Sequence, residues 1–370
     1  MKVLTTTVLA LLGVTGLVLA KDAPSVMVRT ASPLKLPGVG STSDYVADCN
    51  SPLHWAGSTL YIFASCYGGK PWRSEGSDLF SLTSPQSVAY DNQEGYNGGR
   101  WIEATFKDSD GKLYGWYHRE PRGVCGEERS LTAPQIGAAV STDDGMHWRD
   151  LGIVLKAPAD SLYCETANRY FAGGNGDFSV ILDRNKQHFY FLIGTYNKDK
   201  AEQGVSIARM PYTDRDTPVG KVVKWYKGDW SEPGVGGRSS PIFPAAASWH
   251  EPEGDAFWGP SIHHNTHLNQ YVVLLNRAKD QNWAQEGIYV TYNPDLSDPS
   301  GWSKPVKILD APELEASKWY PQVIGVDARR AETDKLSGQI ARLFVAGISK
   351  WELVFLRPGE SAPTSQPARH

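Results

Sequence analysis

The amino-acid sequence predicts an all-β fold, a five-bladed β-propeller whose blades each hold four antiparallel strands. A hairpin made of a short strand and a second, aromatic-rich strand recurs four times along the chain, at residues 51–61, 104–114, 179–190 and 261–271. The 36 Gly, 13 Trp and 17 Tyr residues suit tight turns between short strands. No long stretch keeps a helical 3.6-residue apolar period between caps. Because one such sheet cannot bury both of its faces alone, we expect the repeats to pack around an axis.

The N-terminus has the pattern of a secretory signal. Lys2 is followed by an apolar run from Val8 to Leu19, and small residues lie near Ala20, where signal peptidase cleaves. We therefore expect residues 1–20 to be a signal peptide and the mature protein to be secreted, either extracellular or periplasmic. No later segment approaches the about twenty apolar residues of a membrane-spanning helix, so no membrane partner is expected.

Further strands follow each hairpin. The expected strands lie at residues 78–82, 136–141, 204–210 and 287–292, and a fifth unit covers residues 319–324, 341–347 and 351–356. This fifth unit lacks one strand. Residues 25–29 could supply it and close the ring, which would remove two open sheet edges. The propeller then spans residues 24–357, and the Pro-, Ser- and Ala-rich residues 358–370 are expected to form a disordered tail.

The charge balance argues against nucleic acid as a partner. Removal of Lys2 with the signal leaves 36 basic residues (37 − 1) against 41 acidic ones. No basic stripe is present that could neutralise phosphates. We expect a monomer that binds a polysaccharide or an oligosaccharide and needs no cofactor. A structural cation in the central channel remains an alternative.

Four cysteines in an exported chain permit two disulfides in three pairings. If Gly57 and Ser58 form a two-residue turn, paired positions sum to 115, which places Cys49 opposite Cys66. We therefore predict the disulfides Cys49–Cys66 and Cys125–Cys164, with reduced buried thiols as the alternative. A zinc site is not expected, since no Cys-x-x-Cys spacing occurs.

Residues 141–148 read Ser-Thr-Asp-Asp-Gly-Met-His-Trp. This matches the Ser-x-Asp-x-Gly-x-x-Trp box on hairpin turns of sialidases and many other secreted propellers. In such a box the Asp and Ser bind the backbone of their own turn and the Trp packs between strands. Asp143 is therefore expected to be structural.

Acidic residues precede three of the hairpins, at Asp48, Glu103 and Asp177. The first strand of each blade lines the central channel, so these three carboxylates are expected to face one cavity. Cleavage of a glycosidic bond needs one protonated carboxyl and one ionised carboxylate. A third carboxylate nearby raises the pKa of the acid by like-charge repulsion. The alternative is that some of them cap strands or bind a cation.

Several short motifs resemble the clan of five-bladed propeller glycoside hydrolases that includes arabinanases, α-L-arabinofuranosidases and β-xylosidases, and more distantly levanases and invertases. Residues 176–180 (Gly-Asp-Phe-Ser-Val), with Asp183 downstream, are similar to the clan's Asp-Pro-Ser-Val strand. Residues 101–104 resemble its Trp-Ala-Pro strand, and residues 257–260 (Phe-Trp-Gly-Pro) resemble its Glu-Gly-Pro strand. Residues 48–52 resemble the opening Asp strand more loosely. The pattern of blades covers residues 45 to 345.

The resemblance implies roles for single residues. Asp48 would be the general base of an inverting enzyme or the nucleophile of a retaining one, and Asp177 would orient the site and tune the pKa of the acid. The clan's general acid is the Glu of Glu-Gly-Pro, and this chain has Trp258 at that position. Glu103 could act as the acid instead, or Glu251 or Glu253 could do so from the preceding loop.

Candidate substrate contacts lie near the starts of the channel strands. Aromatic faces stack on sugar rings and polar side chains bind hydroxyl groups; the candidates are Arg100, Trp101, Trp258, His263, Asn265, Tyr320 and Gln322. Packing between blades is the alternative for Trp258 and is favoured for Trp319. Strand alternation puts His263 and His267 on one face and His264 on the other, so they are not three ligands to one metal, and no metal ligand is assigned.

These features favour a secreted glycoside hydrolase. A non-catalytic glycan-binding propeller is the main alternative because of Trp258. A sialidase would need three arginines around a carboxylate, for which only Arg100 and Arg169 are placed. A polysaccharide lyase would need a His or Tyr base beside a uronate clamp, for which His263 and Arg100 are candidates.

Overall fold

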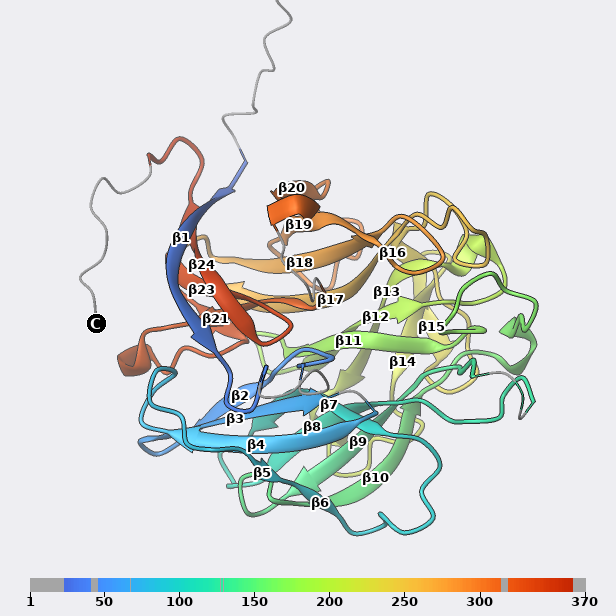
Figure 1. Cartoon of the computed structure of the whole chain (residues 1–370), viewed down its shortest axis with the longest axis horizontal. Helices are drawn as coiled ribbons and strands as arrows, with labels where there is room; N and C mark the ends of the chain where they lie inside the picture. Colours follow the sequence, from blue (N-terminus) through green and yellow to red (C-terminus); the bar gives the residue numbers. More distant parts are fainter. Residues whose placement is uncertain are drawn as a thin grey trace, which may run out of the picture.

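The computed structural model describes residues 23–40, 46–66, 68–126, 128, 130–313 and 319–361. These residues form five antiparallel sheets arranged as the blades of a propeller (Figure 1), which confirms the predicted fold class. The predicted signal peptide, and the predicted tail beyond residue 361, lie outside the described residues. In the described part of the chain, no helix is long and apolar enough to cross a membrane.

The predicted hairpins are the first two strands of blades 1 to 4. Blade 1 contains β2 (Leu53–Ala56), β3 (Thr59–Cys66), β4 (Lys70–Gly76) and β5 (Gln86–Ser87). Blade 2 contains β7 (Arg100–Lys107), β8 (Leu113–Arg119), β9 (Gln135–Ser141) and β10 (His147–Leu155), with β6 (Ala89–Tyr90) added parallel to β10.

Blade 3 has six strands and blade 4 has five. Blade 3 contains β11 (Asn175–Leu182), β12 (His188–Thr195), β13 (Gly204–Pro211), β14 (Val223–Tyr226) and β15 (Asp229–Pro233), with β16 (Pro241–Pro244) paired to β13. Blade 4 contains β17 (Ala256–Asn265), β18 (Gln270–Ala278), β19 (Gln285–Asn293) and β20 (Val306–Asp310), with β22 (Leu336–Ser337) paired to β17. Short 3-10 helices lie at Ala159–Ser161, Lys200–Glu202, Tyr212–Asp214, Ala311–Glu313 and Ala328–Arg330.

Blade 5 closes the ring with strands from both ends of the chain. It contains β21 (Pro321–Gly325), β23 (Ile340–Val345), β24 (Ile348–Leu356) and β1 (Ser25–Lys35). The N-terminal strand β1, blue in Figure 1, runs antiparallel along β24, with Ser25 opposite Leu356. The predicted closure by the N-terminal strand is therefore confirmed.

The hydrophobic core is divided among the interfaces between blades. A buried apolar cluster fills each contact between adjacent blades within the described residues. Trp148 belongs to the cluster between blades 1 and 2, where its ring centroid lies 5.8 Å from that of Phe63. Asp143 binds its own turn, since its Oδ1 accepts hydrogen bonds from the Ser141 hydroxyl and from the His147 amide. Asp143 and Trp148 thus have the structural roles that the box predicts.

One predicted strand is wrong. Residues 78–82 form a turn, in which Asp78 Oδ1 accepts a hydrogen bond from the Phe80 amide at 2.8 Å. The third strand of blade 1 is β4, which starts directly after a turn at Gly68 and Gly69. Both glycines have positive φ, so the chain reverses earlier than the apolar pattern indicates.

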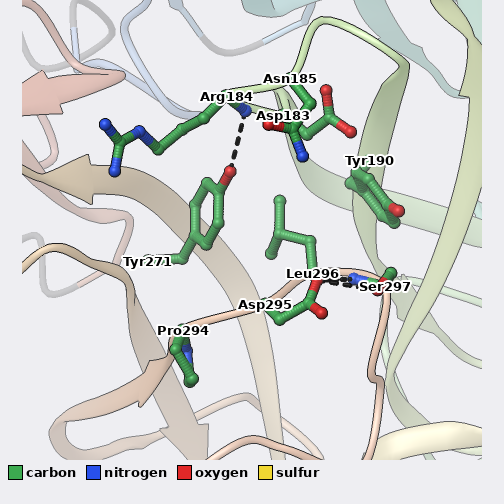
Figure 2. Close-up of a pocket in the computed structure, with 9 residues that line it drawn as sticks. All are labelled: Asp183, Arg184, Asn185, Tyr190, Tyr271, Pro294, Asp295, Leu296 and Ser297. Atoms are coloured by element: carbon green, nitrogen blue, oxygen red, sulfur yellow. Dashed lines mark hydrogen bonds between the residues drawn. The ribbon is translucent and has the colours of Figure 1, made fainter.

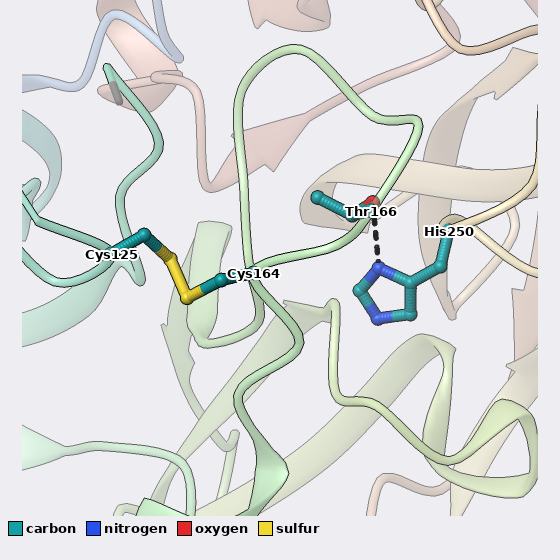
Figure 3. Close-up of a disulfide and its surroundings, with 4 residues drawn as sticks. All are labelled: Cys125, Cys164, Thr166 and His250. Atoms are coloured by element: carbon teal, nitrogen blue, oxygen red, sulfur yellow. Dashed lines mark hydrogen bonds between the residues drawn. A yellow bond between two sulfur atoms is a disulfide. The ribbon is translucent and has the colours of Figure 1, made fainter. Parts of the chain in front are cut away.

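The cysteines give one correct and one wrong pairing. Cys125 and Cys164 form the predicted disulfide, which joins the loop after β8 to the segment before β11 (Figure 3). Cys49 and Cys66 are free, buried thiols. The predicted turn at Gly57 and Ser58 is present, but the register slips by two residues beyond β2, so that Ala47 lies opposite Cys66. Extrapolation from the hairpin turn misplaced Cys49 for this reason.

Candidate active site

Two of the predicted carboxylates are presented by bulges in the innermost strands. In β7 the register shifts between Ile102 and Ala104, which leaves Glu103 as the extra residue. In β11 the shift lies between Gly176 and Phe178, which leaves Asp177, whose φ is +44°. A bulge redirects the side chain of its extra residue. Both carboxylates are buried at one end of the propeller.

The strand-to-strand contacts hold these two groups against each other. The Phe178 amide donates a hydrogen bond to Glu103 Oε2 at 3.0 Å, so the backbone of one bulge binds the side chain of the other. Asp177 Oδ2 accepts the Tyr196 hydroxyl at 2.5 Å and Oδ1 accepts the Tyr320 hydroxyl at 3.0 Å. Asp177 is therefore fixed by blades 3 and 5 together.

Asp48 joins this group from the segment before β2. Its amide bonds to the Ser65 carbonyl at 2.8 Å, and its Oδ2 accepts a hydrogen bond from Trp101 Nε1 at 3.3 Å. Its side chain is half-buried and lies within electrostatic range of Asp177. The structure thus brings together Asp48, Glu103 and Asp177, the three carboxylates that the blade register predicts to share one cavity.

Two residues of the cluster were missed from the sequence, His118 in β8 and Glu120 directly after it. His118 Nδ1 accepts the Asp177 amide at 3.0 Å and lies 3.5 Å from Glu103 Oε1. His118 Nε2 lies 3.2 Å from Glu120 Oε1. The antiparallel pairing of Trp101 with His118 was the signal that could have found them.

The pKa values reflect a crowded group of carboxylates around one imidazole. Burial, then Glu120 and Asp177, raise the pKa of Asp48 to about 7. Burial also raises the pKa values of Glu103 and Asp177, against the opposing effect of His118. Burial lowers the pKa of His118, and the Asp177 amide acts in the same direction because it donates to Nδ1 and needs the neutral ring, whereas the surrounding carboxylates raise this pKa. The cluster therefore binds protons more tightly than isolated side chains would.

An aromatic wall closes the side of the cluster formed by blades 4 and 5. Trp258 is 1% exposed and its ring lies 4.5 Å from Trp283, 5.7 Å from Trp319 and 5.5 Å from Tyr320. Trp258 therefore packs behind Tyr320, the residue that binds Asp177. Tyr320 and Trp283 both have a φ of +60°, and this clustering of strained positions is typical of functional sites.

Four predicted contact residues lie elsewhere. Arg100 is 3% exposed and points into blade 2, where it binds Asp150 at 3.0 Å and stacks on tyrosines. Asn265 binds Ser337 and the Gly338 carbonyl, and Gln322 binds both backbone groups of Ser51. His263 is buried beside Phe355, and burial, with His264 and Lys335 nearby, lowers its pKa to about 3. Of the candidate contacts, Trp101 and Tyr320 touch the carboxylates directly.

The alternative acids and the second arginine are exposed on loops. Glu251 and Glu253 are exposed in the loop before β17, and Arg169 is exposed before β11. Arg100, the candidate for the carboxylate clamp of the sialidase and lyase alternatives, is bound to Asp150.

Glu103, His118 and Asp177 are placed so that they could hold a cation together. One ligand atom from each lies within 4.8 Å of the others. These atoms also hold the cluster together through hydrogen bonds from Phe178, Tyr196 and Tyr320. The described residues therefore build a hydrogen-bonded carboxyl centre, and the predictions on cofactors and on a channel cation stay predictions.

A separate cleft of about 500 Å³ lies between blades 3 and 4 (Figure 2), lined by Asp183, Arg184, Asn185, Tyr190, Tyr271, Pro294, Asp295, Leu296 and Ser297. Asp183 follows the end of β11, six residues after Asp177, which corresponds to about 20 Å along a strand. The cleft is therefore at the opposite end of blade 3 from the carboxylates.

No protein-family model matches the sequence, and no curated protein matches it. Solved structures do match the fold. A thermostable family-43 glycoside hydrolase has a TM-score of 0.51 at 12% identity, with 88% of this chain and 92% of that chain covered. An exo-β-1,3-galactanase from Phanerochaete chrysosporium, with β-1,3-galactotriose, has a TM-score of 0.50 at 13% identity. That match covers 88% of this chain and 64% of the galactanase, so this chain spans less than two thirds of that chain.

At these identities the similarity concerns the fold. The chain has the five-bladed propeller fold of family-43 glycoside hydrolases, as the sequence motifs indicated.

Proposed function

We propose that the protein is a secreted glycoside hydrolase that cleaves a polysaccharide or oligosaccharide. The observation that carries this proposal is the convergence of Asp48, Glu103 and Asp177 from three blades onto one end of the propeller. Glycosidic cleavage requires a carboxyl that stays protonated near neutral pH. Asp48, with its pKa raised to about 7 and its side chain half-buried, meets this requirement.

Glu103 and Asp177 form a buried pair of carboxyl groups in the site. Glu103 and Asp177 are 1% and 3% exposed, and their nearest ligand atoms lie within 4.8 Å. Carboxyl groups that bracket a sugar and a water are about 6.5–9.5 Å apart. Because both groups are buried, the role of this pair is electrostatic, and Asp177 contributes to the raised pKa of Asp48.

Aromatic side chains at the rim support a sugar ligand. Tyr170 is 40% exposed and its ring lies edge-on to the half-buried Trp319, with 6.2 Å between centroids. Flat aromatic faces of this kind stack on the apolar faces of sugar rings. The disulfide Cys125–Cys164 is consistent with an exported, oxidised protein. We propose a monomer that uses no cofactor for the reaction.

A glycan-binding protein without catalysis is the second candidate. It is favoured by one observation, Trp258 at the position where the related hydrolases hold the acid, because this indole packs on Tyr320 and carries no exchangeable carboxyl proton.

The test is release of reducing sugar from a panel that contains arabinan, xylan and β-1,3-galactan, the last because the galactanase holds β-1,3-galactotriose. Asp48→Asn and Asp177→Asn are each expected to lower the rate by at least about 10²-fold. Asp295→Asn is the matched control and should keep the wild-type rate, because Asp295 lies in the cleft between blades 3 and 4, away from the carboxylates. Wild-type rates in both site variants would refute the proposal. Binding of a panel member by calorimetry, without release of sugar, would establish the second candidate instead.

A further inference from the structure

Two carboxyl groups of the cluster reach its surface. Asp48 is half-buried, and the side chain of Glu120 is 31% exposed, whereas the side chain of Glu103 is 1% exposed. A reacting carboxyl must touch the substrate, so the exposed pair is better placed for the reaction than the buried pair. Trp258 cannot supply the second group.

Trp101 and His118 lie between these two carboxyls. The Trp101 indole donates to Asp48 Oδ2 at 3.3 Å, and its ring meets the His118 ring edge-on with 5.4 Å between centroids. His118 Nε2 in turn lies 3.2 Å from Glu120 Oε1. Asp48 and Glu120 are thus the outer members of one contiguous row of side chains.

The two carboxyls also act on each other. Among the charged groups that influence Asp48, Glu120 comes first, ahead of Asp177, and His118 acts in the opposite direction. Glycosidic cleavage needs two neighbouring carboxyl groups that both reach the substrate.

We propose that Glu120 is the second catalytic residue, the general base opposite Asp48, and that His118 is a positioning residue for it. This inference rests on the proposed function. It reverses the role that the family resemblance implies for Asp48, which here donates the proton.

The reaction balances with these two groups and one water. Asp48 gives its proton to the glycosidic oxygen as the bond from that oxygen to the anomeric carbon breaks. A water oxygen bonds to the anomeric carbon and loses a proton to Glu120. The products are a sugar hemiacetal and an alcohol, and the proton on Glu120 returns to Asp48 through solvent.

Leaving-group dependence separates the two roles. A good leaving group needs no proton, so loss of the acid is masked on an activated substrate, whereas loss of the base is not. On 2,4-dinitrophenyl glycosides of arabinose, xylose and galactose, Asp48→Asn should lose less than about tenfold, while Glu120→Gln should lose about 10²–10⁴-fold. On unactivated oligosaccharides both variants should be impaired. Glu94→Gln, an exposed acid in the loop before β7, is the matched control and should keep wild-type rates.

The opposite pattern, or a wild-type rate in Glu120→Gln, would overturn the assignment to Glu120. The proposed hydrolase function would still stand if Asp48→Asn and Asp177→Asn were impaired. A wild-type protein that is inactive on every substrate would overturn both.

A titration tests the coupling without any substrate. With ¹³C-labelled aspartate, the Asp48 carboxyl resonance, assigned from its loss in Asp48→Asn, is followed against pH. Glu120→Gln removes a like charge, so the Asp48 midpoint should move to lower pH, while Glu94→Gln should leave it in place. An unchanged midpoint in Glu120→Gln would refute the proposed pairing.

Discussion

Replacement of Asp48 by Asn is expected to stabilise the protein at alkaline pH. The pKa of Asp48 is raised from 3.8 to about 7 in the folded protein, mainly by burial and by the carboxylates of Glu120 and Asp177. The folded state therefore binds this proton more tightly than the unfolded state. The resulting stabilisation is fully present below pH 3.8 and is lost as the pH rises through about 7.

The magnitude follows from the shift. About three pKa units at 1.36 kcal/mol each correspond to about 4 kcal/mol, as an upper value for a half-buried group. Asn resembles the neutral carboxyl and its oxygen can still accept the Trp101 hydrogen bond. The variant should therefore match the wild type at pH 4 and exceed it at pH 8. With an unfolding entropy near 2.1 cal/mol/K per residue over about 340 residues, 4 kcal/mol corresponds to about 6 °C in Tm.

The assay is urea or thermal unfolding of both proteins between pH 4 and pH 8. Asp216→Asn is the control with the opposite sign. Hydrogen bonds from Lys112 and Tyr114 lower the pKa of Asp216, so its contribution is present at neutral pH and is lost on acidification. A constant difference between Asp48→Asn and the wild type across this range, or a less stable variant at pH 8, would show that Asp48 is not held protonated by its surroundings.

Two further predictions concern the supports of the site. Removing the Cys125–Cys164 disulfide by a double Ser substitution should lower the free energy of unfolding by about 4 kcal/mol, from the loop entropy of a 39-residue separation; equal urea midpoints for variant and wild type would contradict this. In Gly176→Ala the new Cβ would lie 2.5 Å from His118 Cε1. We therefore expect the free energy of unfolding to fall by about 1–3 kcal/mol and the His118 resonance in NMR spectra to shift. An unshifted resonance would show that the added methyl group does not displace His118.

The sequence was sufficient to predict the closed ring of blades and to place the three acidic residues near one end of the channel. The hairpin repeat indicates the innermost strands of blades 1 to 3, and Asp48 lies before β2, Glu103 within β7 and Asp177 within β11. Strand alternation also explains an error: Trp101 turns toward the site, so the adjacent Arg100 faces the interior of blade 2.

The missed residues of the cluster and the wrong cysteine pairing share one cause. Local spacing cannot reveal where a strand gains an extra residue, and bulges at Glu103 and Asp177 decide which neighbours meet. These shifts bring His118 and Glu120 next to the two carboxylates. A slipped register likewise separated Cys49 from Cys66.

The closure of blade 5 by β1 has a consequence for biosynthesis. Leu356, the partner of Ser25, is synthesised 331 residues later than Ser25 (356 − 25). At about 5–20 residues per second, synthesis leaves β1 without its partner for roughly 20–60 s. During this interval an unpaired strand edge can associate with other chains. A route that keeps the chain unfolded until it has crossed a membrane would let both ends of the ring meet at once.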